Sequence, residues 1–289
     1  MAIGHGPEQG EENMLGYIPD EEEYRSEEPR HGQKGVLLMR TRTIRAGEYL
    51  EAEIYPVIDQ EHAPRERRKK STEQMRAANI RRARKTLERI LNANFGPGDL
   101  IAHFTCEEEM TEDEFTAVRR SFMDRLRRAY KRAGQRLKYA YVTEITGSGD
   151  RRRYHVHMVL GGGPLSRDEV EGLWRAGLAR ADRVKMQEHG LAGIAYYITQ
   201  HKSAQERMMA HKWAASRGLI NPEKSRRLCT VSDHKFSRAA AARLDKAVRE
   251  DAERVFAKRY PGYQLIDWRV SYSDFLPGVY VRAFMRRLN

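Results

Sequence analysis

Apolar and polar residues alternate between Val36 and Val57, which predicts two β-strands joined by a hairpin. The four residues Arg45–Glu48 include a glycine and are placed to form the turn. The alternation separates two faces of the second strand: Leu50, Ala52 and Ile54 on one, and Tyr49, Glu51 and Glu53 on the other.

A strongly basic helix is predicted next. Between Arg65 and Arg89 there are eleven basic and three acidic residues, and Ser71 with Gln74 has the spacing of a capping box. A buried stripe at spacings of three and four consists of Ile80, Ala83, Leu87, Ile90 and Leu91. The bases lie mostly off this stripe. The helix therefore presents either a phosphate-binding face, with Arg81, Arg82 and Lys85 as candidates, or an ordinary solvated face.

A compact module follows from residue 100 onward. The patterns predict strand, helix, hairpin, helix, strand and helix in that order, with capping boxes at Thr111/Glu114 and Ser166/Glu169. The strands are Leu100–Thr105, Lys138–Glu144 and Tyr154–Leu160, with Val184 in a short further strand and a last helix at Leu191–His201. This order predicts the α+β class: a central, mostly antiparallel sheet with helices packed on it. A helix at Ser237–Ala257 and strands at Gln264–Tyr272 and Val279–Met285 are expected to complete the fold.

Charge is divided unevenly along the 289 residues. Residues 1–30 carry a net −7, so the remainder carries +19 of the overall +12. The acidic segment has few apolar residues and is expected to be disordered, whereas the basic remainder favours a polyanion, most often nucleic acid. No apolar run approaches the roughly 20 residues of a membrane span, and the N-terminus lacks the apolar region of a secretion signal. We therefore expect a cytoplasmic protein that does not enter the membrane.

Candidate chemistry lies on the third predicted strand of the module. Strand alternation sends Tyr154, Val156 and Met158 to the core face and projects His155 and His157 together from the other face. Glu144 ends the preceding strand, and the hairpin brings it toward the same face. Two imidazoles and a carboxylate suit a divalent ion, Mg²⁺ or Mn²⁺, that handles phosphate. A pair of surface or hydrogen-bonded histidines is the alternative interpretation.

Two adjacent tyrosines lie on the helix predicted at Leu191–His201. With Ile194 at the centre of the packed face, Tyr197 falls about 60° away, at its edge, and Tyr196 about 160° away. Tyr197 is therefore the better candidate for a nucleophile that leans over the sheet. Tyr196 is the neighbouring alternative, otherwise suited to a solvated or DNA-stacking ring. A phenol, with a pKa of about 10, needs help to attack phosphorus, and a metal ion on the phosphate supplies it.

These pieces, in this order, resemble the HUH superfamily of single-strand DNA endonucleases, and more closely the rolling-circle replication initiators of filamentous-type phages and related plasmids. The phrase Lys138–Glu144 leading to Tyr154–His157 resembles the metal motif of that group, and Leu100–Thr105 resembles its first strand motif. Trp213–Leu219 followed by Asn221-Pro222 resembles a downstream signature, and Tyr260–Tyr263 and Gly278–Arg287 also look like that group.

The resemblance implies a ferredoxin/RRM-like sheet and a specific reaction. Tyr197 would attack a phosphate held by the metal on Glu144, His155 and His157, leaving a 5′-phosphotyrosine and a free 3′-hydroxyl. The partner would be single-stranded DNA at a replication origin hairpin. Because the chain has no phosphate-binding loop of the Gly-x-x-x-x-Gly-Lys type, a host helicase would be needed along with a host polymerase. We expect a monomer.

One position departs from the family pattern. The family usually has Tyr-x-x-Lys, but Gln200 stands where the lysine is expected. His201, as a proton carrier or phosphate contact, and Lys202, as a DNA contact, are the nearest substitutes. Further DNA contacts are expected from Arg217 and from Arg151, Arg152 and Arg153 in the loop before the histidine strand, although a solvated turn explains the loop equally well.

Four segments are therefore expected: an acidic tail at 1–34, a strand pair and basic helix at 35–98, the endonuclease domain at 99–222, and a C-terminal helix and strand pair at 223–289. Two other functions fit the same sequence. One is a plasmid mobilisation relaxase with the same chemistry, and the other is a non-catalytic DNA-binding regulator whose histidines are structural.

Overall fold

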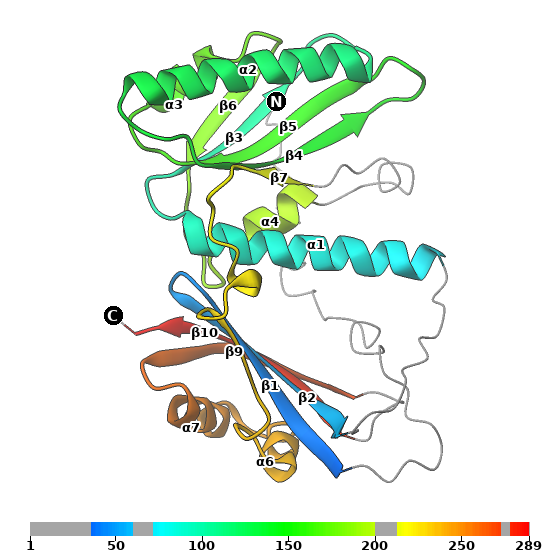
Figure 1. Cartoon of the computed structure of the whole chain (residues 1–289), viewed down its shortest axis with the longest axis vertical. Helices are drawn as coiled ribbons and strands as arrows, with labels where there is room; N and C mark the ends of the chain where they lie inside the picture. Colours follow the sequence, from blue (N-terminus) through cyan, green and yellow to red (C-terminus); the bar gives the residue numbers. More distant parts are fainter. Residues whose placement is uncertain (1–35, 60–71, 200–212, 273–277, 289) are drawn as a thin grey trace, which may run out of the picture.

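The computed structural model describes residues 36–59, 72–199, 213–272 and 278–288. The acidic tail, Ser71, Gln200, His201 and Lys202 lie outside the described residues. The described chain is α+β, as predicted, but it contains two five-stranded antiparallel sheets instead of one central sheet. Figure 1 shows the layers, with α1 (Thr72–Asn94) and α4 (Ala192–Thr199) between the two sheets.

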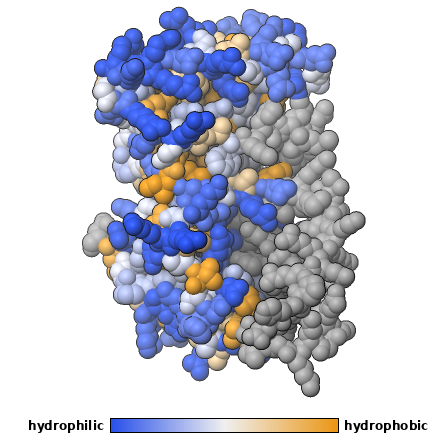
Figure 2. All heavy atoms as spheres, viewed as in Figure 1, coloured by the Kyte–Doolittle hydropathy of each residue, from blue (hydrophilic) through white to orange (hydrophobic). Residues whose placement is uncertain are grey.

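The surface of the described part is mainly polar. In the view of Figure 2, hydrophilic residues cover most of it, with smaller apolar patches between them. Within the described residues, no helix is long and apolar enough to cross a bilayer.

The first sheet has the strand order β6-β3-β5-β4-β7. Its bounds are β3 Leu100–Thr105, β4 Tyr139–Thr146, β5 Arg153–Leu160, β6 Ala179–Arg183 and β7 Ala214–Ala215. Val184 directly follows β6, one residue beyond the strand. The predicted alternation holds on β5, where Tyr154, Val156 and Met158 are buried in the core under α2 (Glu112–Arg132) and α3 (Arg167–Gly172).

Both helices over this core begin where their sequences predict. Thr111 and Glu114 form a reciprocal capping box on α2, and Ser166 and Glu169 form one on α3. Each box satisfies backbone N–H groups that the first helical turn leaves unpaired. Two capped helices therefore cover one face of the sheet (Figure 1), and the opposite face remains for α1, α4 and the candidate site.

The second sheet has the strand order β8-β1-β2-β10-β9. The predicted hairpin forms β1 (Val36–Ala46) and β2 (Tyr49–Asp59), and the C-terminal pair forms β9 (Tyr263–Tyr272) and β10 (Val279–Arg287). β10 pairs with β2, and β8 (Cys229–Ser232) pairs with β1. The N- and C-terminal elements therefore join each other in a sheet of their own instead of extending the first sheet.

The single helix predicted at Ser237–Ala257 is wrong. The chain forms α6 (Arg238–Arg243) and α7 (Arg249–Arg259), with an extended Val248 before the second helix. Trp268 Nε1 donates to the Leu244 carbonyl, which the end of α6 leaves without a helical partner (3.2 Å). Helical periodicity continues across the break because both helices pack apolar residues on the same core of the second sheet.

A buried ionic cluster joins α1 to the second sheet. Arg89 donates from Nε to Glu51 Oε2 (2.8 Å) and from Nη2 to Glu53 Oε1 (2.7 Å). Lys85 Nζ lies 3.1 Å from Glu51 Oε1, and Arg282 Nη2 lies 3.3 Å from Glu53 Oε1. The face of β2 that carries Tyr49, Glu51 and Glu53 is thus the face toward α1, and its carboxylates are buried against cations.

The charges in this cluster change the acidity of its members. Burial by itself would raise the pKa of Glu51, but the charges of Arg89, Lys85 and Arg282 outweigh burial and hold that pKa well below its usual value. The pKa of Glu53 is lowered in the same way, against burial, by Arg89 and Arg282. Both carboxylates therefore stay ionised in the folded protein at pH values where an unfolded chain would protonate them.

This cluster predicts an acid-dependent loss of stability. Because the folded pKa of Glu51 is depressed, its contribution is complete above the unfolded pKa near 4.5 and is lost as pH falls below that value. We expect Glu51→Gln to be less stable than the wild type at pH 7, with the difference narrowing as pH falls from about 5 to 3. Urea unfolding of both proteins across this range measures the difference. A gap that stays constant with pH would contradict the assignment.

The hairpin turn predicts a second stability effect. Gly47 has φ 62°, and a Cβ there would lie 2.2 Å from the Asn92 carbonyl oxygen on α1. We expect Gly47→Ala to cost more than the ~1–2 kcal/mol of left-handed strain alone, because the turn must also move away from α1. Gly134, with φ 71° and open space around its Cβ position, is the matched control. Equal losses of unfolding free energy for the two alanine variants would refute the close approach.

Candidate active site

Three of the predicted site residues lie together on the face of the first sheet that α1 and α4 cover. Glu144 on β4 pairs directly with His155 on β5, and His157 follows two residues later on the same face. The opposite face of β5 packs in the core, so the alternation that predicted this arrangement is present in the structure.

The three side chains differ in what they contact. His157 is 5% exposed, and its Nε2 lies 2.9 Å from Glu144 Oε2. His155 has a threonine hydroxyl at each ring nitrogen, with Thr105 Oγ1 3.1 Å from Nδ1 and Thr146 Oγ1 3.3 Å from Nε2. Glu144 and His157 therefore already meet, while His155 is held beside them by the neighbouring strands.

A third histidine belongs to this cluster, and it is not among the site residues predicted from the sequence. His103 on β3 pairs in register with His157, and the two rings stack with centroids 4.3 Å apart. Its Nε2 is buried without a hydrogen-bond partner. Burial first, and then the neighbouring His157 and His155, lower the pKa of His103 to about 4. The signal was available, because alternation in Leu100–Thr105 places His103 opposite the buried Ala102 and Phe104.

α4 places Tyr197 over this cluster. The Tyr197 ring meets the His157 ring edge-on, with centroids 5.5 Å apart, and the side chain is 56% exposed. Asn92 Oδ1 on α1 accepts from the backbone N–H of Leu191 at the start of the helix (2.7 Å). At its other end, Arg84 donates from Nε to Thr199 Oγ1 (2.7 Å). α1 therefore fixes both ends of the short helix that carries the tyrosine.

Tyr196 faces a different neighbour. The guanidinium of Arg84 lies over the Tyr196 ring, 4.7 Å from its centroid. The wheel that put Tyr197 at the edge of the packed face and Tyr196 beyond it thus agrees with the structure. Of the two rings, Tyr197 is the one in contact with the histidine cluster.

The donor types at this face fit a divalent ion, with imidazole nitrogens and a carboxylate close together and one buried imidazole nitrogen, that of His103, unpaired. The arrangement is not yet a coordination sphere. Across the part of the chain that the structure describes, no three His, Cys, Asp or Glu side chains are placed to hold a metal. His155 would have to give up its threonine contacts to join Glu144 and His157 on one ion.

Comparison with known proteins locates this region within one family. Residues 99–202 match the family model of the replication-associated protein of the ORF2 type. The match supports a rolling-circle replication initiator. It includes the histidine cluster and both tyrosines, whereas all five strands of the second sheet lie outside it. No curated protein and no solved structure matches the chain.

The loop arginines inside the matched region separate into two groups. Arg153 is exposed at the start of β5, two residues before His155, and so lies on the histidine face. Arg151 instead contacts the start of α2, with Nη1 3.0 Å from Glu114 Oε2. The neighbouring Arg152 pairs with Met110 through its backbone. Arg153 is therefore the loop arginine best placed to meet a strand bound at the histidines.

The other basic candidates are spread over the molecule. Lys85 is buried in the ionic cluster, 2.8 Å from Glu88 Oε1, so it does not lie on an open phosphate-binding face. Arg82, on the same helix, is exposed, and Arg81 is partly buried. Arg217 lies beyond β7 beside a groove of about 810 Å³ that Arg127, Lys131 and Arg136 also line.

Proposed function

We propose that this protein cuts and rejoins single-stranded DNA at a replication origin and so starts rolling-circle replication of a phage or plasmid. One observation carries the proposal: an exposed tyrosine, Tyr197, stands against a buried pair of His157 and Glu144 on one sheet face. The match of residues 99–202 to replication-associated proteins supports the same role. The basic character of the chain supports a nucleic-acid partner.

The proposed step is a transesterification. The Tyr197 oxygen attacks the scissile phosphorus, the new bond makes a 5′-phosphotyrosine, and the bond from phosphorus to the 3′-oxygen breaks. The phenol loses one proton and the departing 3′-oxygen gains one, so the step needs no external oxidant or hydrolytic water. Because α1 holds α4 at both ends, the phenol is positioned before the DNA arrives, which reduces the entropic cost of the attack.

Glu144, His155 and His157 would hold a divalent ion, Mg²⁺ or Mn²⁺, with His103 next to them. When bound, the ion would polarise the scissile phosphate and make its phosphorus more electrophilic. The partial burial of the site limits competing attack by water. His201 and Lys202, beyond the described end of α4, are proposed to carry the proton and to contact the DNA.

Metal removal and a histidine variant test this proposal. We expect labelled single-stranded origin DNA to be cut with Mn²⁺ and left intact with EDTA. We expect His157→Ala to lower cleavage by about 100-fold or more, since even partners outside the ligand shell of a metal typically matter 10- to 100-fold. Calorimetry should show weaker Mn²⁺ binding by the same variant.

His234, exposed just after β8, provides the matched control, and His234→Ala should cut at the wild-type rate. Full cleavage in EDTA, or by His157→Ala, would contradict the metal assignment. Tight binding to the same DNA with no cleavage by the wild-type protein would favour a non-catalytic regulator instead.

A further inference from the structure

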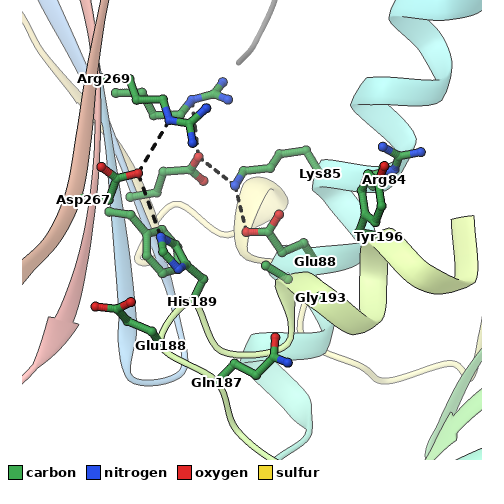
Figure 3. A pocket seen from close by; sticks show the side chains of 14 residues that line it. Arg84, Lys85, Glu88, Gln187, Glu188, His189, Gly193, Tyr196, Asp267 and Arg269 are labelled. Atoms are coloured by element: carbon green, nitrogen blue, oxygen red, sulfur yellow. Dashed lines mark hydrogen bonds and ion pairs between the residues drawn. The ribbon is translucent and has the colours of Figure 1, made fainter. Parts of the chain in front are cut away.

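A second cavity lies on the other side of α4 from the histidine cluster. It has a volume of about 400 Å³ and is enclosed by α1, α4, the loop at residues 187–189 and strands β2, β9 and β10 of the second sheet. Figure 3 shows Tyr196 and Arg84 at one side and His189, Asp267 and Arg269 at the other. The cavity therefore joins the matched region to the sheet outside the match, and its size is that of a site for one small ligand.

The side walls of this cavity are flat. On one side, the Tyr196 ring carries the Arg84 guanidinium over it. On the other, the His189 ring stacks on Phe284 with centroids 5.2 Å apart and planes 20° apart. Phe284 is supported from behind by Tyr49, whose ring stacks on it at 5.4 Å. Rings held in this way suit a planar aromatic ligand, since nucleic-acid bases stack on such side chains.

The charges around the cavity are balanced. Its lining includes four basic residues (Arg84, Lys85, Arg269 and Arg282) and four acidic residues (Glu51, Glu88, Glu188 and Asp267). Several are already paired: Lys85 Nζ lies 2.8 Å from Glu88 Oε1, and Arg269 Nε lies 3.6 Å from Asp267 Oδ2. A phosphate group would therefore meet as much negative as positive charge. A neutral ligand with hydrogen-bond donors at its edge suits this lining better.

We infer that this cavity binds one unpaired base of the DNA strand that Tyr197 holds. The inference rests on the proposed function, because it takes the strand at Tyr197 as its source of the base. Tyr196 and Tyr197 are consecutive, so α4 presents one ring to the histidine cluster and the next to the cavity. A strand fixed at Tyr197 has its neighbouring nucleotides close to the Tyr196 ring.

The carboxylates predict which bases fit. Asp267, Glu88 and Glu188 offer acceptors at the cavity wall. Cytosine, adenine and guanine carry exocyclic amino groups that donate to such acceptors, whereas thymine does not. We therefore expect a preference against thymine at this position of the bound strand.

Photo-crosslinking of Tyr197→Phe protein tests the inference without cleavage. Two single strands of about 15 nucleotides, the upper end of the usual footprint on single-stranded DNA, serve as probes, one containing 5-iodocytosine and one containing 5-iodouracil at every position. After irradiation, peptide mass spectrometry should find adducts on Tyr196 or His189, severalfold more with the cytosine probe. Adducts confined to other residues would overturn the cavity assignment, and an equal or greater yield with uracil would overturn the base preference.

Variants add a second readout. Tyr196→Ala should reduce the His189 adduct at least tenfold, and Tyr196→Phe, which keeps the ring, should restore it. Tyr272→Ala, at an exposed tyrosine on β9 away from the lining, should leave the yield unchanged. An undiminished His189 adduct in Tyr196→Ala would count against stacking between the two walls.

A third probe, 5-iodo-deoxycytidine monophosphate alone, separates a strand from a free nucleotide. Labelling by the mononucleotide but not by the strands would assign the cavity to a free nucleotide and overturn the inference. The result is also separable from the proposed function. A labelled cavity in a protein whose wild type forms no DNA adduct would remove the proposed chemistry alone, whereas an intact adduct with an unlabelled cavity would remove only this inference.

Discussion

Replacing Tyr197 by phenylalanine is expected to abolish the covalent protein–DNA product while leaving single-stranded DNA binding close to the wild-type level. The substitution removes the oxygen that would bond to phosphorus and keeps the ring that contacts His157. No other group at the described site is a hydroxyl of comparable exposure over the histidines. Denaturing gels with 5′- and 3′-labelled strands measure the product, and a filter assay measures binding.

Tyr196→Phe is the matched control because it makes the same change one residue away. This variant should still form the adduct, since the Tyr196 ring faces Arg84 and not the histidine cluster. Adduct formation that survives in Tyr197→Phe but is lost in Tyr196→Phe would assign the nucleophile to the other tyrosine.

Replacing Arg89 by alanine is expected to destabilise the protein by about 3–5 kcal/mol, because it leaves Glu51 and Glu53 buried without their closest cation. Burial by itself would lower the pKa of Arg89, but Glu51, Glu53 and Glu223 together raise it well above its usual value, so the guanidinium is charged throughout the accessible pH range. Chemical denaturation at pH 7 measures the loss.

An exposed ion pair provides the comparison for that experiment. Arg127 lies 2.8 Å from Asp124 on α2, but both side chains are about half exposed. Arg127→Ala should therefore change the free energy of unfolding by only about 0–1 kcal/mol. Similar losses for the two variants would show that burial does not set the strength of the Arg89 cluster.

Local signals in the sequence predicted much of the first sheet and its site. The capping boxes at Thr111 and Ser166 mark helix starts because they involve residues only three positions apart. Period-two alternation put His155 and His157 on one strand face, and hairpin geometry brought Glu144 opposite His155. The same alternation carried His103, but a single histidine on a strand is a weaker signal than a pair.

Long-range pairing was not predictable in the same way. β2 and β10 are more than 200 residues apart, and nothing in either strand names the other as its partner. Lys85 reads as one base among many on a basic helix, yet it is buried because Glu51 and Glu88 stand next to it in the fold. The cavity beside Tyr196 likewise depends on two sheets meeting across α4.

The most direct test of the central claim is to map the covalent bond itself. Wild-type protein would be incubated with Mn²⁺ and a single-stranded origin oligonucleotide, then digested with nuclease and protease, and its peptides sequenced by mass spectrometry. We predict a nucleotide phosphate on Tyr197, attached through the 5′ side of the cut. A bond on another residue, or cleavage products with no protein-linked nucleotide, would contradict the account.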